Sequence, residues 1–174
     1  MDFAAASELL EFDRQALLAG DIWRLWTCHL VHYTLQHLLL DGAVVAIAGL
    51  IAAQRLGLRT VGKALAFGAP CIALGLLLAA PELHYYRGAS GIAVMLTVMA
   101  GLSLWRDADG RARAVLMLMA VALPAKVVAE AAGWTRGWSD LPPDVAIAWQ
   151  AHLLGSVAGV IAVAKARASG LKLD

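Results

Sequence analysis

The chain has 174 residues, of which 61% are hydrophobic and 16% are charged, and its mean hydropathy is +0.71. An ordinary soluble domain is about 45–50% apolar and about 25% charged, so the composition argues against a soluble globular protein. The net charge of +1 gives no indication of nucleic-acid binding. A chain of this length without a long linker has no room for a second domain.

The N-terminal segment is not expected to span a membrane. Residues 3–18 contain three acidic residues and one arginine, and ionisable side chains are costly to place in hydrocarbon. Trp23-Arg24 follows this segment, and we expect the pair to lie in a loop on the outer side of the membrane.

Apolar runs long enough to cross a hydrocarbon core of about 30 Å follow in the rest of the chain. Five such runs are visible, at Leu35 to Ala53, Ala64 to Ala80, Ala89 to Trp105, Ala112 to Ala132 and Val145 to Ala164. Because backbone exposed to lipid must satisfy its own hydrogen bonds, we predict an all-α, polytopic helical bundle in the lipid bilayer. Residues 1–174 would form a single membrane domain.

Lysine and arginine residues gather on one side of this predicted bundle. Nine of the fourteen lie in the first and third inter-span loops and in the tail, namely Arg55, Arg59, Lys63, Arg106, Arg111, Arg113, Lys165, Arg167 and Lys172. The positive-inside rule makes that side, and with it the C-terminus, cytoplasmic.

Two polar residues are placed where nucleophilic chemistry is possible. Ser90 opens the third predicted span and His152 lies inside the fifth, and both spans are entered from the outer side. The predicted boundaries place His152 about 10 Å below the start of its span, so the third span is expected to begin below the membrane surface. Gly88 and Gly91 permit such a dip.

Small residues beside these two side chains favour close packing of their helices. Gly155 and Gly159 share a face with His152, and small residues four apart let membrane helices approach each other. Gly91 follows Ser90 directly. Close approach would bring the Ser90 hydroxyl, a weak nucleophile alone, within reach of the His152 base.

These motifs resemble the rhomboid intramembrane serine proteases. The resemblance rests on Trp23-Arg24, His32 and His37, Gly88-Ala89-Ser90-Gly91, and His152 with Gly155 and Gly159, and it runs from about Leu10 to Ala164. The small size and the stretch Pro81 to Arg87 look most like the rhombosortase branch.

The resemblance implies a serine endopeptidase that works without a cofactor or a metal. Ser90 would be the nucleophile and His152 the general base in a dyad without an orienting carboxylate. The Ser90 backbone N–H and the His37 side chain would hold the oxyanion, supported by Gly88 and Ala89. Substrates would be transmembrane proteins, and a rhombosortase would cut exported proteins with a glycine-rich C-terminal motif at a bacterial inner membrane.

The chain departs from the family pattern at Asp41, where family members carry an asparagine. An ionised aspartate donates no hydrogen bond, so it cannot stabilise an oxyanion as an amide does. Burial would favour its neutral form, whereas His37 nearby would hold it charged. We predict that Asp41 supports His37, one turn away, instead of contacting the oxyanion.

A second departure concerns the first helix of the six-helix family core. Only 22 residues precede Trp23, so either that helix is lost or truncated, or the true start lies upstream of Met1. We favour the second explanation.

Other functions remain open at this stage. The chain could be a catalytically inactive rhomboid-like scaffold that binds membrane helices, or its five histidines could ligate haem or a metal. Lys126 and Glu130 are expected to form an i, i+4 ion pair, with substrate gating as a second interpretation. Tyr85 and Tyr86 are expected at the outer membrane interface.

Overall fold

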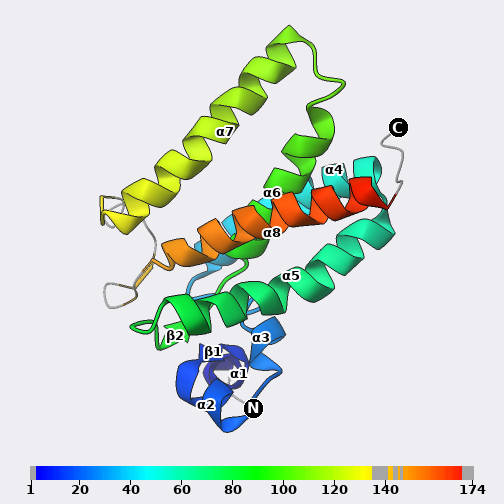
Figure 1. Cartoon of the computed structure of the whole chain (residues 1–174). Helices are drawn as coiled ribbons and strands as arrows, with labels where there is room; N and C mark the ends of the chain where they lie inside the picture. The colour runs from blue at the N-terminus through cyan, green and yellow to red at the C-terminus, as the bar shows by residue number, and fades with distance from the viewer. Residues whose placement is uncertain (1–2, 135–140, 143–144, 146, 170–174) are drawn as a thin grey trace.

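A computed structural model describes residues 3–134, 141–142, 145 and 147–169 of the chain. These residues form an almost entirely helical bundle with one two-stranded sheet (Figure 1), which confirms the predicted all-α class. The elements are α1 (Phe3–Leu10), β1 (Phe12–Asp13), α2 (Arg14–Ala19), α3 (Arg24–Thr27), α4 (Leu35–Leu56), α5 (Leu58–Ala79), β2 (Tyr85–Tyr86), α6 (Ser90–Leu104), α7 (Gly110–Ala131) and α8 (Trp149–Ala168).

Four helices among the described residues, α4, α5, α7 and α8, are long and apolar enough to cross a membrane. The third predicted span is shorter, because α6 has only 15 residues and therefore extends over about 22 Å. A helix of that length does not cross a core of about 30 Å. Ser90 at its start therefore lies below the level at which the longer helices begin, if the far end of α6 is level with theirs.

The predicted start of the fifth span at Val145 is wrong. The helix begins at Trp149 and continues to Ala168, so His152 lies in its first turn instead of about two turns inside. The depth mismatch between Ser90 and His152 that the sequence predicted is correspondingly smaller. Lys172, one of the basic residues used for orientation, lies outside the described residues.

The centre of the bundle is α6, which lies between α4 and α8 (Figure 1). Eight of its fifteen residues are buried, including Met95, Leu96 and Met99. A helix that is apolar on every side is expected in such a central position. In contrast, α7 has no buried residue and diverges from the bundle, meeting α8 near the end of α7 and the start of α8 (Figure 1).

Glycines bring the backbones of α6 and α8 together. A Cβ atom added at Gly155 would collide with the carbonyl oxygen of Gly91, and one added at Gly159 would lie 2.6 Å from that of Met95. A Cβ at Gly91 would lie 3.0 Å from the carbonyl oxygen of Ala151. The small residues therefore set the separation of the two helices that carry Ser90 and His152.

The N-terminal segment packs against the C-terminal end of α5 and holds the loop that leads to Ser90. Phe12 of β1 pairs with Tyr86 of β2 in an antiparallel ladder. The Arg14 guanidinium donates four hydrogen bonds, to the carbonyl oxygens of Leu76 (3.2 Å), Leu77 (2.9 Å), Ala80 (2.7 Å) and Leu83 (3.0 Å). These bonds lie at and just beyond the C-terminal end of α5, where backbone carbonyls lose their helical partners.

Candidate active site

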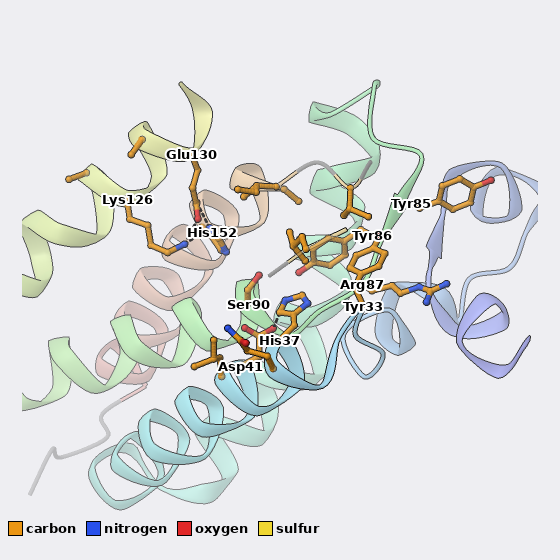
Figure 2. Close-up of a pocket in the computed structure, with 18 of the residues that line it drawn as sticks. Tyr33, His37, Asp41, Tyr85, Tyr86, Arg87, Ser90, Lys126, Glu130 and His152 are labelled. Carbon is orange, nitrogen blue, oxygen red and sulfur yellow. Dashed lines mark hydrogen bonds and ion pairs between the residues drawn. The ribbon is translucent and has the colours of Figure 1, made fainter. Parts of the chain in front are cut away.

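A cavity of about 690 Å³ opens between α4, the loop from β2 to α6, α7 and α8. Ser90 is seen between His152 and His37 in Figure 2. The lining residues are Tyr33, Gln36, His37, Leu40, Asp41, Tyr85, Tyr86, Arg87, Ser90, Ala122, Ala125, Lys126, Ala129, Glu130, Leu141, Val145, Ile147, Ala148 and His152.

Gly88 shapes the loop before Ser90. Its φ of +134° is one that side-chain-bearing residues rarely adopt, and a Cβ there would lie 2.8 Å from Cε1 of His37. The Gly88 N–H donates to the carbonyl oxygen of Cys28 (3.1 Å), and the Gly88 carbonyl accepts from the Tyr86 hydroxyl (2.8 Å). From the sequence we expected Gly88 to permit a dip of the chain before Ser90, and in the structure it also makes room for the His37 ring.

Tyr86 is part of the site and not an interfacial aromatic residue as expected. Its side chain is buried, whereas that of Tyr85 is 57% exposed. Burial raises the pKa of the Tyr86 phenol, so its O–H remains available as a donor. The Tyr86 ring lines the same cavity as Ser90.

His152 is buried on α8 and faces α7. Its Nδ1 atom lies 2.6 Å from Oε2 of Glu130 and 3.3 Å from Nζ of Lys126 (Figure 2). Lys126 also pairs with the other Glu130 oxygen, Oε1, which confirms the predicted i, i+4 ion pair. Within the described residues no hydrogen bond joins Ser90 to His152, and catalytic hydrogen bonds are often loose when substrate is absent.

A second polar cluster lies on the other side of Ser90. The Asp41 Oδ2 atom is 3.3 Å from Nε2 of both His32 and His37, and the Ala89 N–H points at Nε2 of His32 (3.3 Å). Asp41 therefore connects the His37 ring to the histidine that contacts the backbone just before Ser90.

Four of the five histidines have ring nitrogens close to protein polar groups, namely His29, His32, His37 and His152. His29 is buried, with Nδ1 at 3.2 Å from the Gly88 carbonyl oxygen and Nε2 at 3.0 Å from that of Ala69. Desolvation lowers the pKa of this imidazole, which favours its neutral form. Across the described ranges no group of three His, Cys, Asp or Glu side chains is placed to hold a metal ion.

A family model for the Rhomboid domain matches residues 19–169. The chain belongs to the rhomboid family. With the apolar helices, this membership makes it an integral membrane protein of a family of serine intramembrane proteases. No curated protein matches the chain significantly.

Within this rhomboid domain the structure gathers the predicted site residues around one cavity or its supporting loop. Ser90, His152, His37 and Asp41 line the cavity, and Gly88 with Ala89 forms the loop before the serine. Gly91, Gly155 and Gly159 lie at the contact between α6 and α8.

The sequence interpretation assigned no role at the dyad to three residues, His32, Tyr86 and Glu130. His32 carried a partial signal, because it is an additional histidine five residues before His37. Glu130 carried another, as a carboxylate inside an apolar helix. No spacing rule distinguishes Tyr86 from Tyr85 in the sequence. Which of the two rings is buried depends on the pairing of β2 with β1.

Proposed function

We propose that the chain is an intramembrane serine endopeptidase in which Ser90 and His152 form the catalytic dyad. The observation that carries the proposal is that Ser90 and His152, from two helices in backbone contact, line one cavity. Membership of the rhomboid family supports the same reaction.

The Ser90 hydroxyl would attack the scissile carbonyl carbon while Nε2 of His152 takes the hydroxyl proton. For this step the Ser90 hydroxyl must point toward Nε2 of His152. The proton then passes to the leaving amine and an acyl-enzyme forms. Water would attack the ester, with His152 again accepting and returning the proton, to release the new carboxyl end and free Ser90.

The tetrahedral oxyanion would be held by the Ser90 N–H and the His37 ring. The Ser90 N–H is in the first turn of α6, where backbone donors lack helical partners and where the helix dipole favours negative charge. Asp41 would fix the orientation of the His37 ring, since its Oδ2 atom lies 3.3 Å from Nε2. Donors held in place before reaction stabilise developing charge without reorganisation.

We further propose that the substrate is a transmembrane protein cut in or near its membrane helix. A helical peptide bond is shielded by its own hydrogen bonds, so the substrate must unwind locally, and small or helix-breaking residues are expected at the cut. Following the rhombosortase-like stretch before Ser90, substrates would be exported proteins with a glycine-rich C-terminal motif, an apolar helix and a basic tail. The site would open to the periplasmic side of a bacterial inner membrane.

The test is cleavage of a co-expressed reporter that carries such a tripartite C-terminal segment. We expect the reporter to be shortened by the wild-type chain and to remain intact with Ser90→Ala or His152→Ala at matched expression. A reporter equally processed with Ser90→Ala would contradict the proposed nucleophile. A well-folded wild type inactive on the reporter and on active-site probes would favour a catalytically inactive scaffold.

A further inference from the structure

We propose that Glu130 is a positioning residue for His152, so that α7 supplies a carboxylate to what would otherwise be a two-residue site. This inference rests on the proposed function. Oε2 of Glu130 lies 2.6 Å from Nδ1 of His152, and the two side chains are 6% and 7% exposed. A short contact between a buried carboxylate and an imidazole N–H is among the stronger hydrogen bonds in proteins.

The contact determines which nitrogen of His152 carries the proton. An ionised carboxylate only accepts hydrogen bonds, so the atom facing it, Nδ1, must be the protonated one. Nε2 is then left with its lone pair, as a general base for Ser90 requires. The Lys126 ammonium lies 3.3 Å from the same Nδ1 atom and can only donate, so a hydrogen bond to it would require an unprotonated Nδ1. Pairing Lys126 with Oε1 of Glu130 removes that conflict.

The position of Glu130 on α7 supports a functional role for its carboxylate. None of the α7 residues is buried as a whole, yet the Glu130 side chain is almost fully covered and reaches toward His152 (Figure 2). Lys126, four residues earlier on α7, is 51% exposed. Placing a carboxylate out of water is costly unless it is paired and hydrogen-bonded, and here its partners are Lys126 and the candidate catalytic base.

The inference links the placement of α7 to the reactivity of Ser90. Because α7 meets α8 near this pair and otherwise diverges from the bundle (Figure 1), a displacement of α7 would withdraw the carboxylate from His152. His152 would then be free to rotate or to change its protonated nitrogen. A substrate helix that separates α7 from α8 would therefore change the orientation or the protonated nitrogen of His152 as well as open a path to the cavity.

The test is the rate of labelling by a fluorophosphonate probe in the detergent-purified full chain, with Ser90→Ala as the blank. In Glu130→Gln the amide oxygen is drawn to Lys126, and the NH₂ group then faces Nδ1 and imposes the wrong tautomer. We expect labelling at least ~10-fold slower, because mispositioning the base removes part of the ~10²–10⁴-fold that general-base catalysis contributes. Glu130→Asp, which keeps the carboxylate, should recover part of the rate.

A double substitution separates positioning from packing. In Lys126→Met/Glu130→Gln the amide oxygen is free to face Nδ1, so labelling should be faster than in Glu130→Gln alone. A matched control is Glu82→Gln, because Glu82 also accepts from α8, through Gln150 (3.1 Å), and should label like the wild type. Thermal unfolding of every variant reports whether the fold is kept.

Two results would overturn the inference. One is a folded Glu130→Gln variant that labels within about twofold of the wild type. The other is equal loss in Glu130→Asp, Glu130→Gln and the double variant, which would assign Glu130 a packing role only. A wild type that does not label at Ser90 would instead overturn the proposed function, so the two failures are distinguishable.

Discussion

The contact between α6 and α8 makes a quantitative prediction for added methyl groups. A Cβ at Gly159 would lie 2.6 Å from the Met95 carbonyl oxygen, whereas ordinary van der Waals contact begins near 3.4 Å. Gly159→Ala therefore requires the two helices to separate locally by about 0.8 Å. Overpacking of this kind costs about 1–3 kcal/mol.

The separation would also reach the dyad, because Ser90 and His152 lie on these two helices. A displacement of about 1 Å at a catalytic group can slow a reaction by about 10²-fold, and the displacement at His152, two turns from Gly159, is smaller. We expect Gly159→Ala to lower the thermal midpoint and to slow fluorophosphonate labelling about 10-fold. Gly155→Ala, whose Cβ would collide with the Gly91 carbonyl, should have the larger effect on both measurements.

Gly62 provides the matched control, since it is helical on α5 and a Cβ there meets nothing within 4 Å. Gly62→Ala should unfold at the same temperature as the wild type or higher, because alanine favours a helix by about 0.5–1 kcal/mol, and its labelling rate should be unchanged. The reasoning is refuted if Gly159→Ala and Gly155→Ala match Gly62→Ala in both unfolding and labelling.

Two further predictions concern Arg14 and Asp41. Arg14→Met removes four hydrogen bonds to carbonyls at and beyond the end of α5. It should cost at least about 1.5–3 kcal/mol, the contribution of a single hydrogen bond to a charged group. Denaturant unfolding measures this cost, and an unchanged midpoint would show that water replaces the guanidinium. Asp41→Asn keeps an oxygen that can accept from His37, so labelling and reporter cleavage should be retained or raised, and complete loss would show that the carboxylate has a role of its own.

The sequence was sufficient for the fold class, and it singled out Ser90 and His152, which line one cavity. Long apolar runs have few structural solutions in lipid. Ser90 and His152 stand out because polar and ionisable side chains inside such runs are costly and usually mark a functional site. The small residues at Gly155 and Gly159 indicated close packing, although only the structure shows that the Gly91 carbonyl meets Gly155.

Span boundaries were harder to predict, because apolar residues do not stop at the end of a helix. Val145 to Ala148 is an apolar run that continues into α8, yet the helix begins at Trp149. The short α6 was likewise not distinguishable from a full span by hydropathy alone.

The partner of His152 could not be predicted because it depends on how α7 is placed. In sequence, Lys126 and Glu130 satisfy each other at i, i+4, and this local pairing accounts for both charges. That Glu130 also reaches His152, 22 residues away in the chain, follows from the meeting of α7 and α8. Local periodicity carries no information about such a contact between helices.

The most direct test of the proposed mechanism is to locate the fluorophosphonate adduct by mass spectrometry of the purified wild-type chain. We predict one adduct per chain on the peptide that contains Ser90, absent after Ser90→Ala and strongly reduced after His152→Ala. An adduct on another residue, or a folded wild type that acquires none, would contradict the assignment of Ser90 as an activated nucleophile.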